Sequence, residues 1–220
     1  MPEGVTKEAG IIQHLWNGAW IAALGVGIVV WGLIFWACLF HRRRKNSPEA
    51  LPPQVRYNLP IEILYTSVPI ILVAVFFVFT ARDQTAIGTV SGRPDVKVLV
   101  EGYQWSWRFT STYDGKTVQV AGTPAQRPEL VLPVGKKIEF NLESRDVAHS
   151  FWVPAFLYKM DLLPGVHNRF EVTTLDKPST YVGRCAELCG VDHSRMLFSV
   201  KLVPQAEYDR YVNSQAGSAQ

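Results

Sequence analysis

A cluster of residues with metal-ligand chemistry stands near the C-terminus, where residues 185–196 read C-A-E-L-C-G-V-D-H-S-R-M. With one histidine further upstream, the candidate ligands are His149, Cys185, Glu187, Cys189, His193 and Met196. Two thiolates, two imidazoles and a thioether form a soft and borderline set that suits copper. A mononuclear blue-copper site needs only one cysteine, with two histidines and a weak axial methionine. The extra cysteine therefore predicts two sulfurs that bridge two copper ions, with one histidine on each ion.

Two other interpretations of these residues remain open. One is a structural disulfide between Cys185 and Cys189, as found on oxidising faces of membranes. The other is a zinc site, although methionine is not among the usual ligands of zinc. His193 and Met196 follow Cys189 by four and seven residues, and this spacing favours copper.

Two uncharged apolar runs indicate that the cluster is anchored to a membrane. Residues 18–40 and 63–81 contain no charged side chain, and a spanning helix needs about 20 apolar residues. Pro69 falls inside the second run, where a membrane helix tolerates it. A buried core hairpin is the alternative, but two charge-free runs of this length favour a transmembrane hairpin over residues 18–82.

The orientation of the hairpin follows from the segment 41–58, which joins the two runs. Its basic residues are Arg42, Arg43, Arg44, Lys45 and Arg56. Positive residues in short loops mark the cytoplasmic side, so we expect 41–58 to be a cytoplasmic loop. The tail 1–17, which lacks the regions of a signal peptide, and the C-terminal part then lie outside. A nucleic-acid patch would also be basic, but its place between two spans argues against one.

The rest of the chain has the texture of a β domain. Short alternating apolar runs, divided by turn residues, predict strands at 95–101, 103–110, 117–121, 129–133, 137–143, 168–174, 179–184 and 196–203. Many short strands at this spacing indicate an antiparallel sandwich or barrel over 95–203. Residues 83–94 are expected to be a linker, and 204–220 a short helix and a tail. Trp105 and Trp107 alternate along one predicted strand, so we expect them to face the same side.

The cluster also resembles a known family. C-x-E-x-C-x3-H-x2-M, preceded by D-V-x-H-S-F-W-V-P at 146–154, is similar to subunit II of the haem–copper cytochrome c oxidases. The aromatic run G-Y-Q-W-S-W at 102–107 matches a third block of that family. The resemblance extends from the first apolar run to about residue 203, and it is strongest to actinobacterial members. It implies a cupredoxin Greek-key domain behind the two-helix hairpin.

The resemblance further implies roles for the candidate residues. The copper A ligands would be His149, Cys185, Cys189, His193 and Met196, together with the backbone carbonyl of Glu187. The carboxylate of Glu187 would reach a Mg or Mn ion shared with the catalytic subunit; a solvated loop acid is the alternative.

Three further residues lie outside the ligand set. The family places a tryptophan where electrons come in, here Trp105, and an acid that docks the donor, here Asp146. It also places a glutamate, here Glu62, at the mouth of a proton pathway, and ionisable residues beside a span are functional candidates. A core tryptophan and an interfacial carboxylate are the ordinary alternatives for Trp105 and Glu62.

The resemblance implies a function as subunit II of an aa3-type cytochrome c oxidase in a bacterial plasma membrane. Such a subunit takes electrons from a c-type cytochrome and passes them to haem a of subunit I, where haem a3 and copper B reduce oxygen while protons are pumped. A quinol oxidase subunit II would share the fold but should have lost the Cys–Cys–His–Met set, which is intact here. A membrane-tethered copper carrier or assembly protein would need neither Glu62 nor the aromatic block. The sequence contains no C-x-x-C-H, so a fused c-type cytochrome is excluded.

The charge of the outer domain bears on the donor. Residues 95–201 hold 13 Lys and Arg against 12 Asp and Glu, a net charge of +1. Long-range steering of a basic soluble cytochrome is therefore weak. We expect a donor held in the membrane, such as a c-type cytochrome anchored in a neighbouring bc1-type complex, and no nucleic-acid partner.

Overall fold

The computed structural model describes residues 1–42 and 54–216. The chain forms two compact units, one made of Met1–Gln13 with Thr85–Gln220 and the other of His14–Gln84. Most of the basic segment of the expected cytoplasmic loop, residues 43–53, lies outside the described residues, as do residues 217–220.

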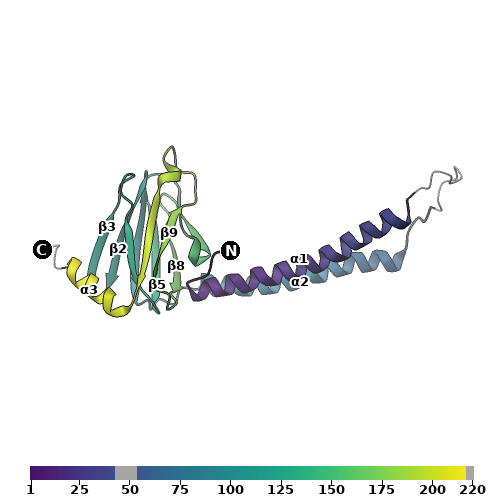
Figure 1. Ribbon diagram of the computed structural model, residues 1–220, viewed down its shortest axis with the longest axis horizontal. Coiled ribbons are helices and arrows are strands. Elements are labelled where there is room, and N and C mark those ends of the chain that lie inside the picture. Colours follow the sequence, from purple (N-terminus) through teal and green to yellow (C-terminus); the bar gives the residue numbers. More distant parts are fainter. Residues whose placement is uncertain (43–53, 217–220) are drawn as a thin grey trace. The chain divides into compact units, whose positions relative to one another are not determined.

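Two long helices, α1 (Lys7–Phe40) and α2 (Leu59–Gly88), form the hairpin and lie side by side in Figure 1. Both are long and apolar enough to cross a membrane. Their apolar side chains are not packed within the protein, as Ile28 and Val73 show with 74% and 68% exposure. An apolar surface of this size is unfavourable in water and favourable in lipid, so the exposure of these side chains supports the transmembrane prediction. Pro69 lies inside α2 without ending it.

The N-terminal residues pack against the β domain, where a tail preceding the hairpin was expected. Val5 and Ala9 are buried, and the Val5 backbone N–H donates to the Ala155 carbonyl over 3.0 Å. Thr6 Oγ1 accepts from the Ala9 N–H over 3.0 Å, which is the contact of a helix N-cap. This cap explains why α1 begins at Lys7, well before the first apolar run.

The β domain is a sandwich of two five-stranded sheets, as the sequence predicts (Figure 1). The first sheet has the order β3-β2-β1-β5-β8 and consists of β1 (Val96–Tyr103), β2 (Ser106–Tyr113), β3 (Lys116–Ala121), β5 (Lys137–Ser144) and β8 (Asn168–Thr173). The second has the order β4-β10-β9-β6-β7 and consists of β4 (Glu129–Pro133), β6 (His149–Val153), β7 (Tyr158–Leu162), β9 (Ser179–Cys185) and β10 (Leu197–Val203).

The strand pairing differs from the antiparallel expectation in two places. β1 pairs with β5 in parallel, and β4 pairs with β10 in parallel. A tight turn cannot join parallel neighbours, and in each pair several strands intervene along the chain. The chain therefore crosses between the sheets, as in a Greek key, and these crossings create the parallel pairs.

Strand boundaries near the ligands were the least well predicted. β6 and β7 were missed, and β6 begins at His149 itself. Each has only five residues, too few for a clear alternation to show. The strand expected at 103–110 begins at Ser106, because Gln104 and Trp105 form a turn. The expectation that Trp105 and Trp107 share one strand was therefore wrong.

The segments flanking the sandwich are more ordered than expected. α2 continues to Gly88, into the expected linker. Beyond it, Ser91 Oγ donates to a carboxylate oxygen of Glu171 over 2.7 Å. At the other end α3 (Gln205–Ala216) exceeds the expected short helix, because Tyr208 and Val212 are buried against the sandwich.

An aromatic core supports the end of the sandwich that carries the ligands. Its fully buried rings are Trp107, Phe109, Phe140, Phe151 and Phe198. Phe151 and Phe198 stack with ring centroids 4.9 Å apart, and Trp107 lies edge-on to Phe198 at 5.2 Å. Close-packed rings of this kind leave little freedom, so they hold strands β2, β6 and β10 in fixed positions at this end of the sandwich.

Candidate metal centre

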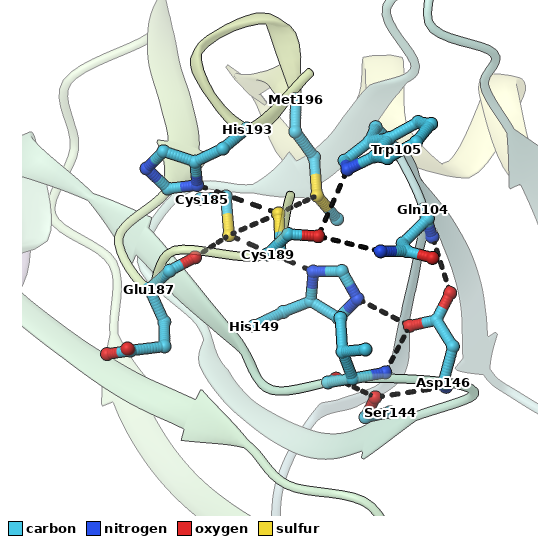
Figure 2. A network of polar contacts seen from close by, with 11 residues as sticks. Gln104, Trp105, Ser144, Asp146, His149, Cys185, Glu187, Cys189, His193 and Met196 are labelled. Carbon is cyan, nitrogen blue, oxygen red and sulfur yellow. Dashed lines mark hydrogen bonds and ion pairs between the residues drawn. The ribbon is translucent and has the colours of Figure 1, made fainter. Parts of the chain in front are cut away.

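The candidate ligands meet at one end of the second sheet (Figure 2). Cys185 ends β9, and the loop that follows returns to β10, which begins at Leu197 opposite Arg184. β6 begins at His149 and pairs with β9, with Phe151 opposite Cys185. A short 3-10 helix over His193–Arg195 turns the loop so that Met196 points back inward. Local topology thus gathers residues that are far apart in sequence.

The ligand atoms converge within bonding range of common ions. Cys185 Sγ lies 3.9 Å from Cys189 Sγ and 3.9 Å from His149 Nδ1. Cys189 Sγ lies 3.6 Å from His193 Nδ1 and 3.7 Å from Met196 Sδ. The Glu187 carbonyl oxygen lies 3.2 Å from Cys185 Sγ. Each sulfur therefore has its own imidazole, and each has one further weak donor.

The two cysteines are free thiols, not the disulfide considered above. The sulfurs lie 3.9 Å apart, close enough for one ion to bind both of them at an ordinary metal–thiolate distance of about 2.3 Å. The ligand atoms of His149, Cys185 and Cys189 lie within 4.8 Å of one another, and all three residues are buried. The donor set fits copper.

The electrostatics of the thiols also favour a bound cation. Burial opposes ionisation of Cys185, but hydrogen bonds with His149 and with the backbone at Glu187 lower its pKa to about 7. Burial and the neighbouring Cys185 raise the pKa of Cys189 to about 12. Without a cation the second thiolate would be held beside the first in a buried site, which is costly. A metal ion between them removes that cost.

Asp146 fixes the orientation of His149. Its Oδ1 accepts from His149 Nε2 over 2.7 Å, and its Oδ2 accepts from the Gln104 backbone N–H over 2.7 Å. Burial opposes ionisation of Asp146, but these hydrogen bonds lower its pKa below the ordinary value. A carboxylate on one ring nitrogen fixes the tautomer and leaves Nδ1 free to bind a metal. The sequence assigned Asp146 only to docking; the docking role stays a prediction, and the contact with His149 was missed.

Trp105 lies directly against the ligand loop. Its Nε1–H donates to the Cys189 carbonyl oxygen over 3.1 Å, and Gln104 Nε2 donates to the same oxygen over 2.8 Å. This contact requires glycine at position 190, where φ is +125° and an added Cβ would lie 2.9 Å from Trp105 Nε1. The sequence analysis missed the roles of Gln104 and Gly190. Both residues stand in motifs that the sequence shows plainly, Gln104 in G-Y-Q-W and Gly190 directly after Cys189.

The remaining candidates are placed as follows. The Glu187 side chain is exposed and points away from the sulfurs in Figure 2. Glu62 belongs to the hairpin unit, in the first turn of α2. Its Oε1 accepts from the Asn58 N–H over 2.9 Å, and Asn58 Oδ1 accepts from the Ile61 N–H over 3.4 Å. This reciprocal pair resembles a capping box, so Glu62 has a structural role that the sequence did not predict.

The candidate ligands His149, Cys185, Glu187, Cys189, His193 and Met196 together form a sulfur-rich cluster, called the cage below. Two apolar membrane helices followed by a β-sandwich with this cage define a membrane-anchored protein of the cupredoxin class. A family profile, Cytochrome C oxidase subunit II, periplasmic domain, matches residues 96–203. A probable cytochrome c oxidase subunit 2 of Streptomyces avermitilis is 47% identical over 100% of this chain and 80% of its own length. Cytochrome c oxidase subunit 2 of Mycobacterium bovis is 36% identical over 96% of this chain and 73% of its own.

Solved structures agree with this assignment. The crystal structure of the periplasmic domain of subunit II of cytochrome oxidase from Bradyrhizobium japonicum covers 58% of this chain and 98% of its own, with 28% identity and a TM-score of 0.51. The chain belongs to the cytochrome c oxidase subunit II family. The actinobacterial resemblance is confirmed, and the protein is anchored in a bacterial plasma membrane with its β-sandwich on the periplasmic side.

Proposed function

We propose that this chain is the electron-accepting subunit of an aa3-type cytochrome c oxidase. It takes electrons from a c-type cytochrome and passes them to haem a of subunit I, which reduces oxygen at haem a3 and copper B and pumps protons. The observation that carries the proposal is the cage in which two thiols 3.9 Å apart each face a separate imidazole. The other oxidase subunits and the bilayer are the remaining partners.

The residues of the cage would hold a binuclear copper centre, copper A. Cys185, Cys189, His149 and His193 would hold the two ions, and Met196 and the Glu187 carbonyl would be weaker donors. When bound, such a centre shares one unpaired electron between its two ions, which makes one-electron transfer fast at small driving force.

The chain contributes rigidity and exclusion of water. His149 and Met196 are fully buried, and the two cysteines are 4% and 3% exposed. Trp107 Nε1–H donates to the Met196 carbonyl over 3.3 Å, which ties the end of the ligand loop to the aromatic core. A ligand set held this firmly moves little when its charge changes, so little energy is spent on rearrangement.

Trp105 would receive the electron from the donor. Its ring is partly exposed, and its N–H reaches the carbonyl of a bridging cysteine. This gives a short route of one hydrogen bond and the atoms of Cys189. Leu188 and Val191, on either side of Cys189 and Gly190, are 77% and 88% exposed and would supply apolar contact to a partner.

The donor would be tethered rather than steered by charge. Asp192, on the ligand loop, lies 3.4 Å from Arg195 and forms an ion pair with it. Residues 95–201 carry a net charge of only +1, so the domain creates little long-range field. A c-type cytochrome anchored in a neighbouring bc1-type complex has a high effective concentration and needs no such field.

Glu187 would bind a Mg or Mn ion shared with subunit I. Its carbonyl faces the sulfurs while its carboxylate points away from them, so one residue can serve two metals. Replacing Glu187 with glutamine should leave the copper spectrum largely intact and weaken Mn binding at least about tenfold, the lower end for a residue that supports a metal site. Manganese EPR of the assembled oxidase measures this, and unchanged Mn binding would eliminate the second role.

Glu62 would stand at the mouth of a proton pathway into subunit I. In Glu62→Gln the amide oxygen can still accept from the Asn58 N–H, so the start of α2 is retained while the charge is lost. We expect turnover and proton uptake to fall several-fold with an unchanged copper spectrum. Stopped-flow proton uptake is the measurement; full wild-type turnover would mean that Glu62 only caps the helix.

The order of electron transfer tests the proposal as a whole. When the oxidised enzyme is mixed rapidly with a reduced c-type cytochrome, the copper absorption should bleach before haem a is reduced. Reduction of haem a while copper stays oxidised would contradict the proposal. Purification of the chain with copper but without subunit I would favour a copper carrier instead.

A further inference from the structure

A buried carboxylate lies beside the copper cage but is not part of it. Glu101, near the end of β1, is only 3% exposed. In the β1–β2 ladder it stands opposite Arg108, whose Nη1 lies 3.5 Å from Glu101 Oε2. A buried charge is costly unless it is paired and hydrogen-bonded, so one cross-strand arginine at this distance is a weak partner.

A second arginine completes the pairing from a different element. Arg145 Nε donates to Glu101 Oε1 over 2.6 Å, and Arg145 Nη2 binds the same oxygen. Arg145 follows β5 and immediately precedes Asp146, the residue that orients His149. The Arg145 backbone N–H also donates to the Gly102 carbonyl over 3.0 Å. The loop bearing Asp146 is therefore tied to the end of β1 twice.

The end of β1 also touches the ligand itself. A Cβ at Gly102 would lie 3.1 Å from His149 Cδ2 and 3.2 Å from His149 Cγ, so the strand packs against the imidazole ring. His149 is thus positioned by β1 at its ring carbons and by Asp146 at Nε2. Glu101 joins these two supports, because it sits on β1 and holds Arg145 of the Asp146 loop.

We propose that Glu101 is a positioning residue for the copper centre, acting through Arg145 and Asp146 on the orientation of His149. The proposal rests on the proposed function, because it assumes that His149 binds copper. The contacts that the structure describes for the Glu101 carboxylate are with Arg108 and Arg145 rather than with the ligands. Its contribution is to keep the imidazole aimed at the ion, which slows copper loss and fixes the electronic character of the centre.

The two arginines give a matched pair of variants for testing the role. Arg145→Met removes the side-chain tie between Glu101 and the Asp146 loop and keeps the backbone bond to Gly102. Arg108→Met leaves the side-chain tie in place and removes an equal charge from the same carboxylate. In purified oxidase, Arg145→Met should speed copper release to a chelator about tenfold, as expected for partners outside the ligand set. It should also shift the histidine nitrogen coupling in pulsed EPR. Arg108→Met should match the wild type in both. Equal behaviour of the two variants would overturn the proposal.

A second pair controls for loss of a buried acid in general. Glu171, 8% exposed, is paired with Lys137 at 3.5 Å and lies on β8, away from the cage. Glu101→Gln should reproduce the copper effects of Arg145→Met, whereas Glu171→Gln should lower only the melting temperature. The proposal would be overturned if copper loss simply followed the fall in melting temperature in both Glu101→Gln and Glu171→Gln. If Glu101→Gln does not fold, the comparison of Arg145→Met with Arg108→Met decides whether the proposal holds. A wild-type enzyme without a paired-copper signal would instead contradict the proposed function.

Discussion

Replacing Cys189 with serine is expected to abolish the paired-copper signal and to lower cytochrome c oxidation by at least about 100-fold, beyond the cost of losing a supporting residue. Serine has nearly the same size, so the loop should keep its fold. Its hydroxyl remains protonated near neutral pH and cannot bridge two ions. The Cys189 sulfur lies within 4 Å of ligand atoms of Cys185, His193 and Met196, so its loss removes three close contacts of the cage at once.

Copper content and EPR of the purified Cys189→Ser oxidase measure this effect. Ser194→Ala, in the short helix of the same loop, is a matched control that should retain both copper ions. A Cys189→Ser enzyme that kept the hyperfine pattern of two equivalent copper ions would show that the thiol of Cys189 is not a bridge.

Trp105→Gln is expected to slow electron input severely. Truncation of a tryptophan at the centre of an interface costs about 2 kcal/mol or more, which is roughly 30-fold in rate or affinity, and loss of the route to Cys189 adds to this. Trp105→Phe keeps an aromatic ring but cannot donate to the Cys189 carbonyl, so its rate of electron input should lie between those of the wild type and Trp105→Gln. Stopped-flow reduction by the native membrane cytochrome measures the rate.

Two controls distinguish slower electron transfer from the cytochrome from a defect in the copper centre itself. In Trp105→Gln a small chemical reductant should reduce the copper at the wild-type rate, because it does not dock. Wild-type oxidation of a soluble basic cytochrome should be slow and only mildly dependent on salt. Fast oxidation that falls steeply with ionic strength would contradict a tethered donor and would point to unpaired acids around Trp105.

Much of this architecture was predictable because its signals are local. The hairpin follows from uncharged runs, and the ligands at 185–196 follow from spacing within one loop. The contacts of Gln104 and Gly190 were not predictable, since they depend on the turn before β2 meeting the loop after β9. The bond between Asp146 and the Gln104 backbone likewise joins two distant segments, whereas the bond between Asp146 and His149 spans only three residues. Tertiary packing brings these distant segments together, and the periodicity of the sequence carries no information about it. The cap between Asn58 and Glu62, by contrast, was local and could have been found.

The extent of the N-terminal helix was missed for a related reason. Thr6 and Val5 are ordered by contact with residues around 155 and 174, far along the chain. Composition alone gave a tail there. Glu101 likewise looked like an ordinary strand residue, and only its burial between two arginines reveals a connection to the cage.

Continuous-wave EPR of the intact protein, with total copper measured on the same sample, tests whether this chain holds a binuclear copper centre. We expect two copper ions in this chain and one unpaired electron shared equally between them, so that the hyperfine pattern is that of two equivalent nuclei. A single copper with the four-line pattern of one nucleus, or zinc in its place, would contradict it.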